Sequence, residues 1–252
     1  MQKLYKKPSI MAIPIFFVSH WYLSLFTQTF FHHRYSAHKM FTMSKFWEKV
    51  FFILSYIFQG SSYLSPYTYG LLHRLHHAYA DTFKDPHSPK NDGNIFKMMW
   101  KTKKIYSKIF DGKLEVADKF KNNLPEWRSF DIFANSWPSR LIMGISYVIF
   151  YIYFVPEGQW YWYLLLPLHF IIGPFHGAII NWFAHTIGYT NFKVKDTSKN
   201  LMPWDIFMLG EGLHNNHHTK PKANFGVKWY EFDPVYPIIV VLNKLRIIRL
   251  KK

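Results

Sequence analysis

The sequence predicts an all-α integral membrane protein, with three to four transmembrane helices and a cytosolic helical cap that carries a histidine-rich metal site. Long stretches without Lys, Arg, Asp or Glu alternate with basic runs, as expected for helices that cross a bilayer. Aromatic residues make up 21% of the chain, and Trp and Tyr favour membrane interfaces. Three clusters of histidines border the uncharged stretches.

Composition narrows the possible functions. The 252 residues suit a single membrane domain that covers residues 1–252. The formal charge is +16, but long uncharged stretches interrupt it, so membrane lipid and not nucleic acid is the expected partner. There is no cysteine, which excludes disulfides and thiolate metal sites.

The N-terminal half begins with a basic leader, Met1–Lys7, and a first span over about 9–31. Ser44 is a predicted helix start. The next uncharged block, about 50–72, is broken by Gly60-Ser61-Ser62 and by Ser65-Pro66. If this block crossed the bilayer, the first two histidine clusters could not meet. We therefore expect a re-entrant or interfacial helix.

The C-terminal half begins with a Lys-rich segment, 81–136, which shows helical periodicity around 95–110. The remaining predicted elements are a span over about 137–155, a span over about 160–187 that Pro167 and Pro174 should kink, and an amphipathic surface helix over about 234–252. The two spans form a hairpin, so the Lys-rich segment and the third histidine cluster share a side. The result is a multi-pass protein with its site on the cytoplasmic side. The basic leader Met1–Lys7 would then lie on the opposite side, which the positive-inside rule disfavours, and an incomplete or re-entrant first span is the alternative that removes this conflict.

Two histidine clusters have the spacing i, i+3, i+4, which aims three imidazoles from one helical turn at a common point. They are His73, His76 and His77, and His214, His217 and His218. His33 and His38 are five positions apart and do not share an α-helical face. They are therefore expected where a helix ends and the chain turns.

With His185, these residues make nine candidate metal ligands: His33, His38, His73, His76, His77, His185, His214, His217 and His218. Neutral imidazole suits Fe, Cu, Ni or Zn and is a poor ligand for Mg or Ca. Nine are too many for one tetrahedral zinc and suit two metals, each with an open position. The ligand set alone leaves iron redox catalysis and a di-zinc hydrolase open.

Charged residues near these clusters have two interpretations. Arg34, Arg74, Asp81, Asp85 and Glu211 could be solvated charges, or the carboxylates could hold ligand imidazoles in place. No catalytic residue beyond the metal ligands is expected.

The chain resembles the membrane fatty acyl desaturases, and within them the delta-nine, stearoyl-CoA-desaturase-like group. The motifs that carry the resemblance are His33-Arg34-x-x-x-His38, His73-Arg74-x-His76-His77 followed by Asp85-Pro86-His87, Asn181-x-x-x-His185, and Gly210-Glu211-Gly212-x-His214-Asn215-Asn216-His217-His218. Trp229-Tyr230-Glu231-Phe232-Asp233, near the C-terminus, adds to it.

This resemblance implies that the nine histidines bind two non-haem irons, and that Asn181 holds a metal-bound water. It implies an O2-dependent desaturase that inserts a cis double bond into a long-chain acyl-CoA or acyl-lipid. The two electrons would come from a separate donor of the ferredoxin, flavodoxin or cytochrome b5 type. Leu71 and Leu72 stand where many acyl-CoA-specific members have an Arg-Asp pair, so CoA, lipid and carrier protein are all candidate acyl carriers.

Other functions would use similar residues. A di-iron lipid hydroxylase begins with the same hydrogen abstraction and is the nearest alternative. A metal transporter would need ligands in mid-span, whereas most of these histidines lie at span ends or in loops. A di-zinc membrane hydrolase would hold zinc and no iron.

Overall fold

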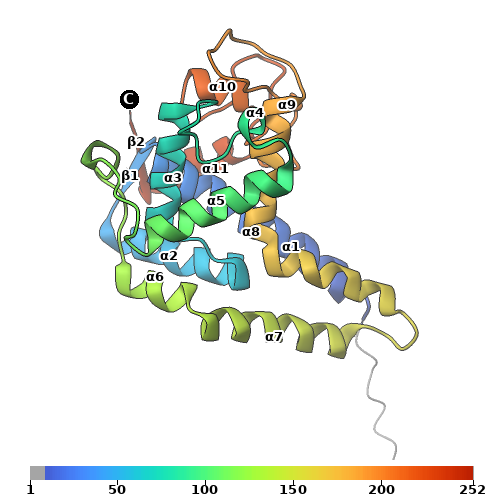
Figure 1. Ribbon diagram of the computed structural model, residues 1–252. Coiled ribbons are helices and arrows are strands. Elements are labelled where there is room, and N and C mark those ends of the chain that lie inside the picture. Colours follow the sequence, from blue (N-terminus) through green and yellow to red (C-terminus); the bar gives the residue numbers. More distant parts are fainter. Residues whose placement is uncertain (1–8, 252) are drawn as a thin grey trace, which may run out of the picture.

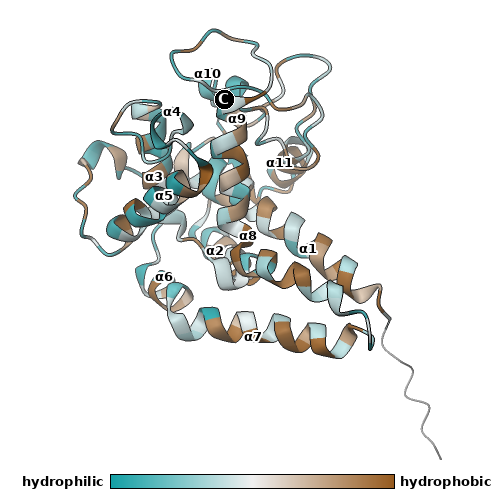
Figure 2. Ribbon diagram, turned by 45° about the vertical axis from the view of Figure 1, so that its right-hand side comes forward, coloured by the Kyte–Doolittle hydropathy of each residue, from teal (hydrophilic) through white to brown (hydrophobic). Residues whose placement is uncertain are grey.

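The computed structural model describes residues 9–251, so the basic leader Met1–Lys7 lies outside the described residues. Long helices α1, α7 and α8 extend to one side of the molecule, and the short helices α4, α9 and α10 gather at the other (Figure 1). Hydrophobic residues dominate α1, α7 and α8, and hydrophilic residues are frequent in the cap formed by the shorter elements (Figure 2). Almost all of the regular structure among the described residues is helical, which agrees with the predicted all-α architecture.

The described helices and strands are α1 (Ala12–Thr27), η1 (Gln28–Ala37), β1 (Phe41–Met43), α2 (Lys45–Gln59), η2 (Gly60–Ser62), α3 (Pro66–Tyr79), α4 (Pro89–Asp92), α5 (Ile95–Phe110), η3 (Asp118–Phe120), α6 (Arg128–Asn135), α7 (Trp137–Phe154), η4 (Trp160–Leu165), α8 (Leu166–Ala178), η5 (Ile179–Phe183), α9 (Ala184–Thr186), α10 (His214–Thr219), α11 (Val235–Lys244) and β2 (Ile248–Leu250).

The first helix reaches the first histidine pair in a π-helical form. It continues from α1 into η1, a π-helix, in which each hydrogen bond joins residues i and i+5. The amide of His38 donates to the carbonyl of His33 at 3.1 Å, which places these two residues one π-turn apart. The helix ends at Ala37 and His38 is its C-terminal cap, so the pair lies at a helix end as predicted. The assumption that such a pair cannot share a helical face was wrong, because the wider π-turn brings residues i and i+5 onto one face.

The second uncharged block forms two helices, not one. Ser44 accepts a hydrogen bond from the amide of Trp47 at the start of α2, as predicted. Gly60, with φ +52°, ends α2, and a Cβ there would overlap the hydroxyl of Tyr147. Ser65 then caps α3 from its side chain, and Pro66 occupies the first turn. The breaks predicted at Gly60-Ser61-Ser62 and at Ser65-Pro66 are thus present, and they divide the expected re-entrant or interfacial helix into α2 and α3.

A helical run from Trp160 to Thr186 is the one helix among residues 9–251 with the length and mean hydropathy of a membrane span. It contains η4, α8, η5 and α9. The expected kink is present: Ile171, three residues before Pro174, has non-helical dihedrals (φ −125°, ψ 18°). The spans predicted over 9–31 and 137–155 are helical, as α1 with η1 and as α7.

The C-terminal segment is only partly helical. Helix α11 ends at Lys244, and β2 then pairs antiparallel with β1, with Phe41 opposite Leu250. The prediction of a helix over 234–252 was therefore wrong. Ile248, in the strand, is buried in the aromatic core that also contains Phe30 and Phe31. Burial of this side chain through strand pairing opposes continuation of the helix.

Arg34 is buried in this core and is no solvated charge. Its Nη2 donates to Asp233 at 2.7 Å, its Nε donates to the carbonyl of Ala223 at 3.1 Å, and its guanidinium lies 3.8 Å from the centroid of Phe225. Arg74 is similarly engaged, since it donates to four backbone carbonyls, those of Ser36, Ala37, Phe120 and Asn122. Both arginines are structural cross-links.

We predict that Asp233→Ala lowers the free energy of unfolding by about 3–5 kcal/mol, because Arg34 would keep its charge in the core without this partner. Asp111→Ala is the matched control, since Asp111 forms an exposed pair with Lys113 at 2.9 Å and should cost about 0–1 kcal/mol. Denaturant unfolding of both variants in detergent measures the difference. Equal stabilities would contradict the structural role of the buried pair.

Candidate metal centre

All nine predicted ligands come together in two groups. They come from η1 and its C-terminal end, α3, α9 and α10. One group contains five histidines (His33, His38, His73, His77 and His217) and the other contains four (His76, His185, His214 and His218). Within each group, one nitrogen from every ring lies within 4.8 Å of the others.

The distances between ring nitrogens match the spacing of ligands around a metal ion. Nε2 of His33 lies 2.9 Å from Nε2 of His217, and Nε2 of His38 lies 2.8 Å from Nε2 of His73. In the other group, Nε2 of His185 and Nε2 of His214 are 3.1 Å apart. Two ligands at right angles, each about 2.1 Å from a metal, have nitrogens about 3 Å apart.

Three carboxylates determine which ring nitrogen carries the proton. Nδ1 of His33 lies 2.5 Å from Glu211, Nδ1 of His76 lies 2.9 Å from Asp85, and Nδ1 of His218 lies 2.9 Å from Asp196. An Nδ1–H that donates to a carboxylate leaves Nε2 with a free lone pair.

Two of these nitrogens provide a direct test of whether a metal fits. Nε2 of His76 and Nε2 of His218 are buried, and neither has a hydrogen-bond partner among residues 9–251. A buried polar atom without a partner is costly, and coordination would remove that cost. The residues present therefore fit a metal centre.

The electrostatic environment keeps these rings neutral. Burial, followed by the proximity of other imidazoles, holds the pKa of His73, His77 and His217 well below the ordinary value of 6.5. Burial alone would raise the pKa of Glu211, but the neighbouring His33 and Arg34 hold it below its ordinary value. At neutral pH the centre therefore combines neutral imidazoles with an ionised carboxylate, the protonation states that bind metal.

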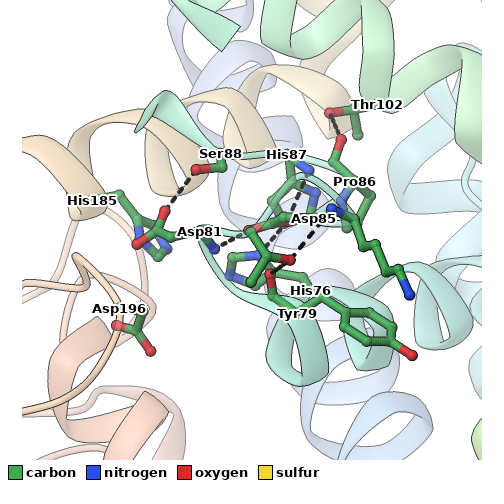
Figure 3. A network of polar contacts seen from close by, with 12 residues as sticks. His76, Tyr79, Asp81, Asp85, Pro86, His87, Ser88, Thr102, His185 and Asp196 are labelled. Carbon is green, nitrogen blue, oxygen red and sulfur yellow. Dashed lines mark hydrogen bonds and ion pairs between the residues drawn. The ribbon is translucent and has the colours of Figure 1, made fainter. Parts of the chain in front are cut away.

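Asp81 does not contact a ligand imidazole. It accepts hydrogen bonds from the hydroxyl of Ser88 and the amide of Thr197, at 2.6 Å each, and the hydroxyl of Thr197 lies 3.2 Å from Nδ1 of His185. Figure 3 shows the carboxylate of Asp81 directed at Ser88 and close to His185, while the backbone amide of Asp81 donates to the carboxylate of Asp85 at 2.8 Å. Of the three predicted carboxylates, Asp85 and Glu211 contact candidate ligand rings directly. Asp81 is connected to His185 only through Thr197.

Two residues of the site, Asp196 and His87, were assigned no role there from the sequence. Asp196, which meets His218, lies in the loop between α9 and α10, and no regular spacing connects it to the histidines. His87 stacks on His76 with ring centroids 4.3 Å apart, and both of its buried nitrogens have no partner among the described residues. The sequence Asp85-Pro86-His87 was the one signal that could have pointed to it.

A large apolar cavity of about 1470 Å³ reaches the histidines. His73, His87, His214 and Glu211 contribute to its inner wall. Asn181, in η5, also lines this cavity and is half-buried. The structure thus places Asn181 beside the same space as the two histidine groups.

Comparisons with known proteins agree with this arrangement. The family described as "Fatty acid desaturase" matches residues 8–242. The chain is 27% identical over 219 residues to "Delta-9 desaturase-like 5 protein" of Arabidopsis thaliana, covering 86% of this chain and 69% of the relative. It is 27% identical over 209 residues to "Delta-9 acyl-lipid desaturase 2" of Arabidopsis thaliana, covering 82% of this chain and 64% of the relative.

A third relative, "Acyl-CoA C20 Delta5-desaturase" of Anemone leveillei, is 27% identical over 230 residues, covering 88% of this chain and 67% of the relative. The chain thus spans about two-thirds of the length of these curated relatives. The matched residues include all nine clustered histidines. The chain therefore belongs to the fatty acid desaturase family, a family of oxidoreductases.

Proposed function

We propose that this protein is a membrane di-iron desaturase that inserts a cis double bond into a long-chain fatty acyl substrate, with O2 as oxidant and two electrons from a separate donor. The observation that carries the proposal is the convergence of five and four histidines at the inner end of a large apolar cavity. Bound iron would supply the oxygen chemistry needed to remove hydrogen from an unactivated acyl chain, which redox-inactive zinc cannot supply.

The remaining parts of the site have roles that follow from their chemistry. The cavity wall is mostly apolar, so it would hold an acyl chain and exclude water from the inner end. Glu211, Asp85 and Asp196 would hold protons on Nδ1 of their histidines, which keeps each Nε2 directed at a metal. Asn181, one turn before His185, would hold a water on a metal.

Exposed side chains support the multi-pass membrane arrangement. Leu141, Ile145, Ile149 and Ile152 form an outward apolar stripe on α7, and α1 exposes Ile15. Such stripes are costly in water and suit contact with lipid. We place the cap on the cytoplasmic side because its helix α5 and several of the loops that join its elements are rich in lysine.

The electron donor would be a small acidic carrier of the ferredoxin, flavodoxin or cytochrome b5 type. A formal charge of +16 favours rapid docking of an acidic partner through complementary fields.

The first test measures iron and product together. We expect about two irons per chain, and a product two hydrogens lighter than the substrate by mass spectrometry. A product one oxygen heavier would indicate the hydroxylase instead. His214→Ala, His217→Ala and His218→Ala should lose iron and activity together, because each removes a ligand.

His32→Ala is the matched control for these variants. His32 is adjacent to His33 in the chain, but its nitrogens lie 3.1 Å and 2.8 Å from the backbone carbonyls of Thr27 and Leu64. It should keep its iron. Normal iron content and turnover in all three ligand variants would refute the assignment.

A second test concerns Asp196, which only the structure identifies. Asp196→Asn should lower iron affinity roughly 10- to 100-fold, because the neutral amide holds Nδ1–H of His218 less strongly. Competition with a chelator measures the affinity. Asp118→Asn, an exposed site far from any histidine group in the sequence, should leave it unchanged. Unchanged affinity in both variants would remove Asp196 from the site.

A third test concerns Asn181. Asn181→Ala should keep its iron, because the histidines remain, while desaturation falls roughly 10- to 100-fold. If Asn181 only stabilises helix packing, turnover stays near normal and the loss of stability is about 0.6 kcal/mol. Iron content and turnover measured on one preparation decide between the two roles, and full iron with full activity rejects the metal-bound water.

A further inference from the structure

We infer that the acyl chain enters the cavity sideways from the bilayer, between α5 and α7, while it is still attached to a membrane phospholipid. The inference rests on the proposed desaturase function and adds the carrier and the route. The names of the relatives include both acyl-lipid and acyl-CoA desaturases, so they leave the carrier open.

The side chains that line the cavity show where it meets the surface. On α5, Phe96, Trp100 and Lys103 lie on one helical face, line the cavity and are exposed. On α7, Trp137 and Leu141 lie one helical turn apart, and both line the cavity and are exposed. Residues that are both exposed and part of the cavity wall mark its opening. Ile171 of α8 and Phe183 of η5 also meet both conditions, so the opening lies between α5 and α7 and extends to the α8–η5 run.

The surface around this opening is apolar. Phe96 is 83% exposed and Trp137 is 76% exposed, and both are too large and too apolar to be placed in water without cost. Leu141 and Ile145 on α7 continue the apolar surface away from Trp137. An opening surrounded in this way faces lipid, so a water-soluble carrier would have to pass its chain through lipid to reach it.

Helix α5 has the pattern of a helix that lies in the membrane interface. Its apolar side carries Phe96 and Trp100, and its remaining surface is rich in lysine, including Lys97, Lys104 and Lys108. Such a helix places its apolar face at the acyl boundary and its lysines among headgroups. The opening beneath α5 therefore lies at the depth where a phospholipid's glycerol backbone joins its acyl chains.

Lys103 is positioned to bind the phosphate of that lipid. Its ammonium lies 4.8 Å from the centroid of Trp100 and forms no ion pair with a described carboxylate. The other charges of the wall at this end are engaged: Arg140 donates to the carbonyls of Ser61 and Tyr63, and Asp111 pairs with Lys113. A single lysine on the wall suits one phosphodiester.

A photolabelling experiment tests the route without requiring turnover. The protein is placed in phosphatidylcholine nanodiscs that contain a phosphatidylglycerol probe with a diazirine in the middle of its acyl chain. Parallel samples receive diazirine palmitoyl-CoA. After illumination, mass spectrometry maps the labelled peptides. We expect the phospholipid probe to label the inner cavity wall near His73 and His214, as well as the opening.

Two charge reversals make the test specific. Lys103→Glu should reduce labelling of the inner wall by the phospholipid probe roughly fivefold, as expected for one lysine near anionic lipid. Lys104→Glu is the matched control, because Lys104 is adjacent and exposed but does not line the cavity. Equal effects of the two reversals would overturn the role of Lys103.

The probes also separate this inference from the proposed function. Inner-wall labelling by palmitoyl-CoA alone, with desaturated acyl-CoA as product, would overturn lateral access of a phospholipid and keep the desaturase. Inner-wall labelling by the phospholipid in a protein that binds no iron would support the route and contradict the desaturase. Desaturation of the phospholipid acyl chain supports both.

Discussion

A buried carboxylate, Glu211, joins the first and third histidine segments, and the rest of the centre depends on that link. It meets Nδ1 of His33 at 2.5 Å, across a separation of 178 residues, and lies 3.6 Å from Arg34. Arg34 in turn pairs with Asp233. An isolated ionised carboxylate could not remain in this core, so the cation and the ring N–H that compensate it have to be brought there by folding. Correct packing of η1 against the loop before α10 is thus coupled to the correct tautomer of a ligand.

The same requirement explains which parts of the site could be predicted from sequence. Two histidine triplets have α-helical spacing and lie on α3 and α10 as expected. The prediction that each triplet converges on one point was wrong, because His76 and His217 each join the group opposite to that of their two neighbours. The pair His33 and His38 obeys a different period, because η1 is a π-helix. Spacing rules for the α-helix therefore identify the correct residues and the helix end, but they place the two side chains on different faces, whereas the π-helix places them on one.

Contacts made by loops and strands were not predictable for a different reason. Asp196 reaches His218 from a loop without repeating structure, and β2 forms only because β1, some 200 residues earlier, offers a partner. Helix α5 could be anticipated, since its periodicity over 95–110 is local and matches Ile95–Phe110. Local patterns determine the helices. The contacts of Glu211 with His33 and of Asp196 with His218, and the end of α11, depend instead on segments that are separated in the sequence.

The division between apolar helices and a polar cap also accounts for the position of the cavity. Helices α7 and α8 expose apolar side chains on their outer faces and also contribute apolar side chains to the cavity wall. Acyl chains can therefore pack against the outer faces and against the cavity wall. At the inner end the wall changes to His73, His87, His214 and Glu211, which belong to the cap. An acyl chain in this space would gain free energy from burial along its length and would meet the histidines at the inner end. Under the proposed function, the reacting carbons would be selected by how far the chain extends before its headgroup is held at the surface. The distance between the α5 rim and the histidines would then set the position of the double bond.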